Sequence, residues 1–471
     1  MKKIVIIFLI FYSLGIANEL PELGSTFDSL ISAADEKKIK FQIMQQVYSS
    51  NSVIRDPEIN DYLGNLGKQL INAGTIEKPQ INFFLINDKS INAFAMLGNV
   101  IGVHSGLLFA ANSESELASV LGHEIAHITQ KHLLRLFDSQ SKNSYKSFLA
   151  VAIAILTARS NPQLASGAIS AASASETQNI LDYTRSNEKE ADRIGLQILD
   201  KAGYDTRGFI DFFSTMQRYN NFTTGPAPSF LRTHPITNDR ISDIQDRLKD
   251  YKYIQKKNKL EFYLAKSKLK ALLGNYLDII DIFNNEIRMR RFINEAAAYY
   301  GLTYSYLRHN KLIEAREAFD VLKKLNDESP MIDQLQATLL IKEKKYQEAF
   351  EVYKKGINKY PDYRSFIYGA ANLIIQSNEP NNAINLLKSY LPLFETDPLI
   401  YELLAKAYNL NGEYLLEHES LSDAYYHQFD LHNAISQMDL ATKTNSVNFF
   451  DQSRVEYRLK ELKKEQNLMN N

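Results

Sequence analysis

Two histidines with a glutamate between them constrain this chain more than any other feature of its sequence. Residues 121–127 are Leu-Gly-His-Glu-Ile-Ala-His, which spaces His123 and His127 four residues apart. In an α-helix this spacing puts both imidazoles on one face, one turn apart, so that both can reach a single ion. Residues 113–116, Ser-Glu-Ser-Glu, form a capping box that would open the helix. The segment is therefore predicted to be a helix that carries two metal ligands.

Glu124 adds a chemical function to this pair. It follows the first histidine directly, where its carboxylate can take a proton from a water molecule on a zinc ion. The combination is the H-E-x-x-H pattern that is typical of zinc peptidases. The alternative is that the two histidines only pack in a core, and the motif by itself leaves that alternative open. Further ligands elsewhere in the chain would favour the metal.

The third protein ligand that a catalytic zinc needs is expected in residues 185–195. Asn187 is predicted to cap a helix there, with Glu190 three residues later completing a capping box. Gly195 is predicted to let this helix approach the first one closely. An apolar stripe at helical spacing marks the buried face, and it consists of Ala191, Ile194, Ile198 and Leu199.

Two carboxylates, Glu188 and Asp192, fall on or beside that stripe, one turn apart. Carboxylates that face the interior are costly unless each has a strong partner. Zinc would satisfy Glu188, and the outer ring N–H of a ligand histidine would satisfy Asp192, which is the usual support of a metal-bound histidine. The alternative, a solvated charged helix start, leaves the inward placement of both carboxylates unexplained.

Together these motifs carry a family resemblance. H-E-I-A-H at residues 123–127, followed by N-E-K-E-A-D at residues 187–192, resembles the zinc peptidases that include the CAAX prenyl proteases and HtpX. The resemblance implies a gluzincin-like peptidase domain, with Glu188 as the third zinc ligand and Asp192 as the residue that orients a histidine. Because those relatives have several membrane spans without counterpart here, the exported branch of the family with C-terminal repeats is the closer comparison.

The resemblance extends to a downstream histidine–proline motif with an arginine six residues after the histidine. Here Thr233-His234-Pro235 is followed by Arg240. The resemblance implies that this segment lies beside the zinc, where Arg240 would stabilise the oxyanion that develops at the scissile carbonyl. His234 would either support that oxyanion or occupy the fourth zinc position until the preceding loop moves. A surface histidine before a proline is the remaining alternative.

The N-terminus, residues 1–17, has the pattern of a signal peptide. Two lysines precede an apolar run over residues 4–11, and residues 15–17, Gly-Ile-Ala, offer a cleavage site after Ala17. The alternative is an uncleaved anchor, although the apolar run is short for a bilayer. The chain has no cysteine, which excludes disulfides and thiolate ligands. A periplasmic location is predicted, and the balance of 54 basic against 55 acidic residues predicts no nucleic-acid partner.

A small sheet is predicted just before the metal helix. Residues 81–86 have the composition of a strand, and residues 93–96 and 100–103 flank a turn, as in a hairpin. An unpaired strand edge beside the metal helix can take up an extended peptide through main-chain hydrogen bonds. A hairpin that serves only as scaffold is the alternative. The predicted substrate edge consists of Asn92, Ala93, Phe94 and Ala95.

Residues 147–175 are rich in apolar and small side chains. A helix over the apolar part would be about 18 Å long, well short of a hydrocarbon core of about 30 Å. One interpretation is a lid or a hairpin that makes peripheral membrane contact. The other, which the short length favours, is a buried helix pair.

From about residue 255 the sequence becomes continuously helical in pattern and repeats every 34 residues. This is the period of tetratricopeptide helix pairs, in which small residues allow close contact and large ones fill the gap between helices. Such a solenoid is predicted over residues 255–450, after a peptidase domain at 18–254, and residues 451–471 are predicted to be a polar, frayed tail. The repeating positions are Ala315, Ala349 and Ala383, and four residues later Phe319, Tyr353 and Leu387.

The remaining histidines are interpreted as structural or solvated. His132 lies nine residues after His123, so a continuous helix would turn it half a turn away from the ligand face. The group consists of His104, His132, His309, His418, His427 and His432.

The sequence thus predicts a mainly helical chain with a small β-hairpin or sheet, in which a zinc peptidase domain precedes a helical solenoid. One Zn²⁺ per chain is expected, held by His123, His127 and Glu188, with Glu124 as general base. The resemblance implies unfolded or stalled envelope proteins as substrates and the outer-membrane barrel-assembly machinery as a partner. The alternative is a chaperone or scaffold that binds through its repeats and has an inert peptidase domain, although an intact Glu124 counts against it.

Overall fold

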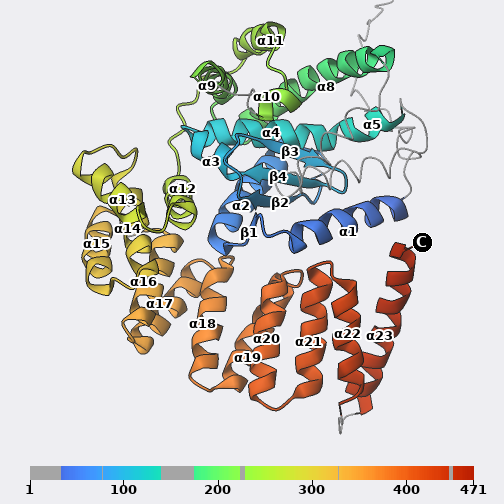
Figure 1. Cartoon of the computed structure of the whole chain (residues 1–471), viewed down its shortest axis with the longest axis vertical. Helices are drawn as coiled ribbons and strands as arrows, with labels where there is room; N and C mark the ends of the chain where they lie inside the picture. Colours follow the sequence, from blue (N-terminus) through green and yellow to red (C-terminus); the bar gives the residue numbers. More distant parts are fainter. Residues whose placement is uncertain are drawn as a thin grey trace, which may run out of the picture.

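The computed structural model describes residues 33–76, 78–138, 174–222, 229–326, 328–444 and 449–470. The predicted signal peptide at residues 1–17 lies outside these residues, as does nearly all of the apolar segment at 147–175. Figure 1 shows an N-terminal domain built around a small sheet, with an arc of paired helices beneath it. The prediction of a mainly helical chain with one small sheet is confirmed. No helix within the described ranges is both long and apolar enough to cross a membrane.

The sheet has four strands in the order β1-β2-β4-β3. The strand predicted at residues 81–86 is β2 (Asn82–Ile86), which runs parallel to β4 (Val100–His104). The short strand β1 (Val53–Ile54) pairs with the other side of β2. The predicted hairpin joins β3 (Ala93–Met96) to β4 in antiparallel pairing. Its turn, residues 97–99, has positive φ at Gly98 (78°) and at Asn99 (59°), a backbone conformation that glycine and asparagine tolerate best. β3 is therefore an edge strand, as predicted.

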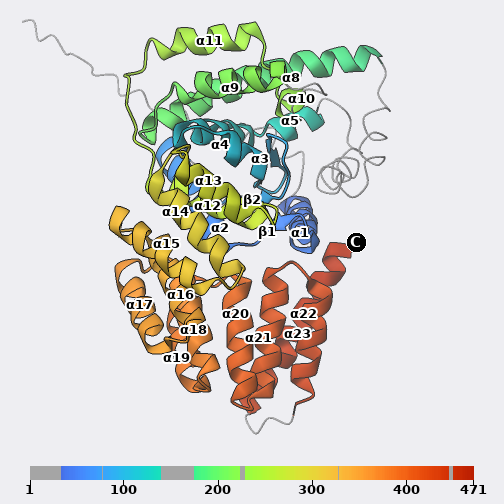
Figure 2. The same cartoon turned by 60° about the vertical axis from the view of Figure 1, so that its left-hand side comes forward.

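Helices enclose this sheet, and α4 is the central one. It contacts β3, which lies beneath it in Figure 1, and it contacts α8 and α9, which lie above it in Figure 2. The helices of the domain are α1 (Ala33–Ser49), α2 (Pro57–Gly74), α3 (Ser105–Ala110), α4 (Glu114–Thr129), α5 (His132–Asp138), α8 (Ala174–Lys201), α9 (Gly208–Phe222), α10 (Ser229–Thr233) and α11 (Asn238–Leu248).

The start of α4 agrees with the sequence, whereas the start of α8 does not. Ser113 caps α4, since its Oγ accepts a hydrogen bond from the Glu116 N–H at 3.1 Å. The predicted capping role of Asn187 is wrong, because α8 begins at Ala174 and Asn187 lies inside the helix. No glycine or proline interrupts residues 174–194, so nothing in the chain stops the helix from extending toward its N-terminus.

The contact between α4 and α8 depends on two glycines. A Cβ atom on Gly195 would lie 2.7 Å from the ring of Phe209 and 3.2 Å from the backbone nitrogen of His123. A Cβ atom on Gly122 would lie 2.9 Å from Leu199. All three distances are shorter than normal van der Waals contacts, so a larger residue at either position would push the two helices apart or displace the neighbouring side chains. The close approach predicted from Gly195 is confirmed.

The C-terminal arc is a series of antiparallel helix pairs. The six residues of the 34-residue repeat lie on α15, α17 and α19, and each is buried. The predicted solenoid is confirmed. Its helices are α12 (Leu260–Leu273), α13 (Ile279–Arg288), α14 (Glu295–Arg308), α15 (Leu312–Leu325), α16 (Pro330–Lys342), α17 (Tyr346–Lys359), α18 (Arg364–Gln376), α19 (Pro380–Tyr390), α20 (Pro398–Leu410), α21 (Tyr414–His427), α22 (Leu431–Thr442) and α23 (Phe449–Asn470).

The frayed tail predicted at residues 451–471 is instead most of α23. Val455 and Leu462, seven residues apart, are fully buried and pack against α22. That spacing is two helical turns, so a narrow apolar stripe attaches an otherwise polar helix. The overall polarity of the segment concealed this stripe.

The first solenoid helix, α12, belongs to two cores. Phe262 and Leu269 lie in the core of the N-terminal domain, whereas Leu264 lies in the first core of the solenoid. On the same helix, the Lys268 ammonium is buried against the carboxylates of Asp56, at 2.8 Å, and Glu58. The predicted boundary at residue 254 falls in the irregular segment before α12, and it stays a prediction.

The far end of the arc returns to the N-terminal domain. Phe429 packs against Phe41 of α1, with ring centroids 5.5 Å apart, and Glu465 of α23 accepts a hydrogen bond from Lys37 at 2.8 Å. In Figure 1 the C-terminus accordingly lies beside α1. Both ends of the solenoid are therefore attached to the N-terminal domain.

We expect Gly195→Ala to destabilise the protein, because the new methyl group must displace the Phe209 ring or the α4 backbone. Overpacking of this kind costs about 1–3 kcal/mol, which urea denaturation can measure. Gly64→Ala in α2 is the matched control, since a Cβ atom there meets nothing within 4 Å. An equal loss of stability in both variants would contradict the close packing of α4 and α8.

Candidate metal centre

Three separate parts of the chain meet at one buried point. α4 contributes His123 and His127, α8 contributes Glu188, and the residue after α10 contributes His234. One ligand atom from each of the four lies within 4.8 Å of the other three. The Nε2 atoms of His123 and His127 are 3.0 Å apart, and Glu188 Oε1 is 3.3 Å from His127 Nε2. The three predicted ligands are thus brought together, and His234 joins them.

His234 faces this group through its Nδ1 atom. That nitrogen is 2.9 Å from Glu188 Oε1 and 3.3 Å from His123 Nε2. The segment is anchored to the strand side of the domain, because Phe230 N–H donates to the carbonyl of Ile91 at 3.1 Å and the His234 N–H donates to the carbonyl of Phe230 at 2.7 Å. The imidazole is buried, which contradicts the alternative of a surface histidine.

Burial and hydrogen bonding shift the pKa values of these groups in opposite directions. Burial lowers the pKa of His127 to about 3. Burial also acts to lower the pKa of His123, but hydrogen bonds to Asp192 and Glu188 outweigh it and raise that pKa to about 10. Burial would raise the pKa of Glu188, yet the surrounding histidines hold that pKa well below its ordinary value. Glu188 is therefore ionised, as a metal ligand must be.

Asp192 lies behind His123. Its Oδ1 is 2.9 Å from His123 Nδ1, the nitrogen that faces away from the other ligands. The Arg240 guanidinium holds the same carboxylate through two short contacts, Nε to Oδ2 at 2.6 Å and Nη2 to Oδ1 at 2.7 Å. Burial acts to raise the pKa of Asp192, but the charge of Arg240 outweighs it and lowers that pKa. This is the placement expected for a residue that orients a ligand histidine.

Arg240 has contacts different from those that the sequence led us to expect. Besides Asp192, its Nη1 contacts Glu188 Oε2 at 2.9 Å and donates to the carbonyl of Pro235 at 2.9 Å. All three guanidinium nitrogens are engaged with these groups, and the residue is 2% exposed. The geometry favours a role in holding Asp192 and Glu188 in place over direct stabilisation of an oxyanion.

Glu124 lies between the ligand group and the edge strand. Its Oε2 accepts a hydrogen bond from the Ala95 N–H of β3 at 2.8 Å. Its Oε1 is buried, has no hydrogen-bond partner among the described residues, and lies 3.5 Å from His234 Nε2. Burial raises the pKa of Glu124. A buried carboxylate with one uncommitted oxygen and a raised pKa is suited to accept and hold a proton.

The predicted substrate edge runs along this carboxylate. The main-chain N–H and C=O groups of successive residues in β3 point alternately toward β4 and away from it. Because the Ala95 N–H points to Glu124, the groups of Ala93 and Ala95 point outward, and those of Phe94 point toward Gly102 of β4. The Asn92 carbonyl accepts a hydrogen bond from the His104 N–H at 3.0 Å. The outer edge of β3 therefore passes directly beside the candidate general base.

Two residues to which the sequence analysis gave other roles also adjoin this centre: His132, interpreted as structural or solvated, and Glu190, expected to complete a capping box. His132 Nδ1 lies 2.8 Å from His127 Nδ1, and its Nε2 lies 3.2 Å from Glu190 Oε2. α4 ends at Thr129 and Lys131 has a positive φ of 51°, so the helix does not continue and His132 turns back toward His127. Burial and the charge of Arg135 lower the pKa of His132 to about 4. No glycine or proline signals this reversal in the sequence.

The donor set fits zinc better than a hard cation. Zinc prefers histidine nitrogens together with a carboxylate in fourfold coordination, whereas magnesium and calcium require mostly oxygen ligands. Here the converging atoms are three imidazole nitrogens and one carboxylate oxygen. The ring nitrogens of His123 and His127 that face away from the group both have hydrogen-bond partners, which is how metal-binding histidines are normally fixed.

Comparisons with known proteins agree with this geometry. The model of Peptidase family M48 matches residues 57–248, which include every residue of the candidate centre, and a tetratricopeptide repeat model matches residues 340–407. The beta-barrel assembly-enhancing protease of Escherichia coli (strain K12) is 28% identical over 455 residues, 95% of this chain and 92% of that protein.

Two further relatives match parts of the chain. A Vibrio cholerae protein named for the same activity is 39% identical over 253 residues, which are 54% of this chain and 52% of that protein. Metalloprotease YcaL of Escherichia coli (strain K12) is 30% identical over 225 residues, which are 46% of this chain and 82% of that protein.

We expect Arg240→Ala to lower the free energy of unfolding by about 3–5 kcal/mol, because it leaves the Asp192 carboxylate buried without its cation. The free energy of unfolding of Arg240→Lys should lie between those of Arg240→Ala and the wild type, since an ammonium cannot bind the carboxylate through two parallel hydrogen bonds. Denaturation in the presence of a chelator would measure these stabilities without a contribution from metal binding. Wild-type stability combined with lost activity would point to the oxyanion role instead.

Proposed function

The chain belongs to peptidase family M48, and from that premise we propose that it is a zinc-dependent endopeptidase of the periplasm that acts on outer-membrane proteins during their assembly. One observation carries the catalytic part: His123, His127, Glu188 and His234 converge within 4.8 Å, with Glu124 beside them. Nitrogen and carboxylate donors in this number are the ligands that zinc prefers.

We assign His123, His127 and Glu188 as the ligands of one zinc ion per chain. Bound there, zinc would act as a Lewis acid toward the scissile carbonyl and lower the pKa of the attacking water. Asp192, itself held by Arg240, keeps the His123 ring oriented through its Nδ1 atom. Removing Asp192 would therefore act on the metal through His123, whereas removing Arg240 would act through both His123 and Glu188.

Glu124 carries the proton in this proposal. Its free Oε1 accepts a proton from the attacking water and later delivers it to the leaving amine. The hydrogen bond from the Ala95 N–H to Oε2 fixes the carboxylate, so that the other oxygen does not have to be reoriented for the transfer. The raised pKa of Glu124, which burial causes, helps the carboxyl to hold the proton between the two steps.

Extended polypeptide is the substrate form that this site suits. A segment that adds to the outer edge of β3 would pair with the main chain of Ala93 and with the carbonyl of Ala95, since the Ala95 N–H is bound to Glu124, and it would pass beside that carboxylate. Main-chain pairing needs an unfolded segment but little sequence specificity. Stalled or unfolded envelope proteins would supply such segments.

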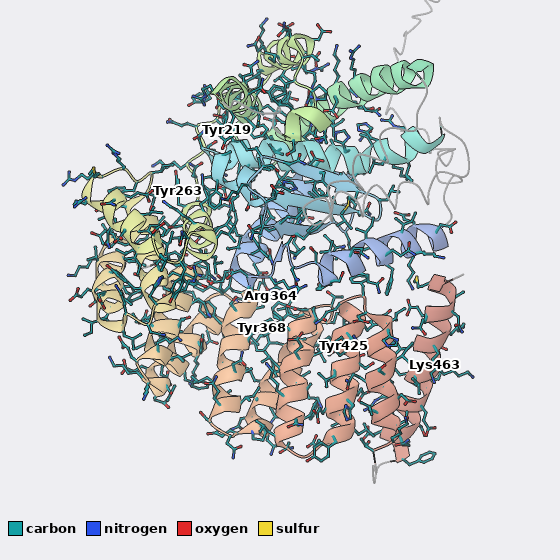
Figure 3. All side chains as sticks on the ribbon, viewed as in Figure 1. Tyr219, Tyr263, Arg364, Tyr368, Tyr425 and Lys463 are labelled. Atoms are coloured by element: carbon teal, nitrogen blue, oxygen red, sulfur yellow. The ribbon has the colours of Figure 1, made fainter. Side chains whose placement is uncertain are left out.

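The solenoid is the proposed partner-binding part. A groove of about 600 Å³ lies between its inner surface and α2, and its lining includes the half-buried Tyr304 and the exposed Asn372, Gln376 and Lys406. Figure 3 shows Tyr368 and Arg364 at the edge of the solenoid nearest α2. Tyrosines and amides on the inner surface of a repeat array are suited to binding polypeptide. The relatives named for beta-barrel assembly support the barrel-assembly machinery as the partner.

Glu124→Gln should reduce cleavage of an unfolded protein such as casein by at least about 100-fold, because the general base is lost while the ligands remain. Zinc content by elemental analysis should stay at the wild-type level. Glu188→Gln is the matched variant and should lose both zinc and activity. Retained proteolysis in Glu124→Gln would refute the assignment of the base.

His234 is proposed to restrain the enzyme by occupying the fourth ligand position. If that position is taken in about 90% of molecules, His234→Ala should raise basal proteolysis about tenfold. A loss of about 100-fold or more would indicate that His234 supports the oxyanion instead. Wild-type kinetics with unchanged zinc content would remove His234 from the mechanism.

A further inference from the structure

The two predicted histidine ligands have different supports, and His132, the residue that contacts His127 directly, lies outside the family motifs quoted above. α4 ends at Thr129, the backbone at Lys131 is left-handed, and α5 starts at His132. This reversal stacks the His132 ring against His127 edge-on, with centroids 4.7 Å apart and an interplanar angle of 80°. His132 is buried, at 3% exposure, although it lies near the end of a helix.

The contact between these two rings fixes where their protons lie. His127 faces the ligand group through Nε2, so its Nδ1 is the nitrogen that meets His132 Nδ1 at 2.8 Å. One nitrogen of that pair must donate and the other must accept. If His127 Nε2 binds a metal, Nδ1 carries the hydrogen and donates, and His132 accepts. His132 must then carry its own hydrogen on Nε2.

That second hydrogen has an acceptor in place. His132 Nε2 lies 3.2 Å from Glu190 Oε2, and Arg135 Nη2 lies 2.6 Å from the same oxygen. Arg135 also donates to Asn187 Oδ1 at 3.4 Å. A chain of hydrogen bonds therefore links the His127 ring, through His132, to the Glu190 carboxylate, which is paired with Arg135.

We propose that His132 is a positioning residue that, together with Glu190 and Arg135, holds His127 in the tautomer and orientation needed to bind zinc. The proposal rests on the zinc site assigned above. Each ligand histidine then has its own carboxylate–arginine pair. Asp192 and Arg240 act directly on His123. Glu190 and Arg135 act on His127 through the imidazole of His132. Outer hydrogen-bond partners of this kind typically contribute about 10–100-fold to metal affinity.

A packing role alone would predict different behaviour. A side chain that only fills space could be replaced by leucine with a loss of stability but no specific effect on the metal. A positioning role requires an acceptor at the place of His132 Nδ1. His132→Asn can provide such an acceptor through its amide oxygen, which branches at the corresponding atom, whereas His132→Leu cannot.

The test is zinc affinity of the full-length protein by competition with a chromophoric chelator. We expect His132→Leu to weaken zinc binding about 10–100-fold. His132→Asn should recover a substantial part of that loss, and the zinc affinity of Glu190→Gln should lie between those of the two His132 variants. His432→Leu is the control, because His432 is exposed on α22, far along the sequence from the centre. Wild-type affinity in His132→Leu, with only the unfolding midpoint of the zinc-free protein lowered, would overturn the proposal.

A second measurement on the unchanged protein covers the case in which His132→Leu fails to fold. Nitrogen-15 NMR of histidine-labelled, zinc-loaded protein identifies which ring nitrogen carries hydrogen. We expect His127 to be protonated at Nδ1 and His132 at Nε2, and any other pattern would overturn the proposal. If the wild type binds no zinc at all, the proposed function fails. If it binds zinc and cleaves casein but His132→Leu binds zinc equally well, only this inference fails.

Discussion

The structure depends on burying two acidic residues of α8, Glu188 and Asp192, against partners that come from other elements. A buried carboxylate without a partner costs several kcal/mol, so each of the two has to be matched. Glu188 meets histidines from α4 and from the segment after α10, and Asp192 meets Arg240 of α11. Folding of the domain and assembly of the centre are for this reason one process. The contact of Gly122 with Gly195 brings α4 close enough to α8 for that match.

The attachment of the solenoid follows the same principle of matched burial. Lys268 of α12 is buried against Asp56 and Glu58 at the start of α2, and α12 contributes apolar side chains to both adjoining cores. At the other end, Phe429 packs on Phe41 of α1. A repeat array tied at both ends cannot swing as a free arm. A groove on its inner surface therefore keeps a defined position relative to α2 and the peptidase domain.

Sequence reasoning was accurate where one local rule decides the outcome. The spacing of the histidines in α4, the inward carboxylates of α8, the hairpin turn at residues 97–99 and the 34-residue repeat each depend on a short-range geometric rule, and each element formed as predicted. It failed where a distant contact outweighs the local signal. Asn187 looked like a helix cap but binds Arg135. Residues 451–471 looked like a polar tail, but most of them belong to α23, which packs through two buried side chains.

By itself, the sequence determined which residues could bind a metal and which elements carry them, because ligand type and helical spacing are properties of a few neighbouring residues. Only the tertiary structure decided how those ligands are supported. Arg240 was expected at an oxyanion but is bound to Asp192, and His132 was expected to be structural but contacts His127. Hydrogen bonds between elements far apart in sequence are set by how helices end and pack. The left-handed backbone at Lys131, which turns His132 back, has no signature in the residue pattern.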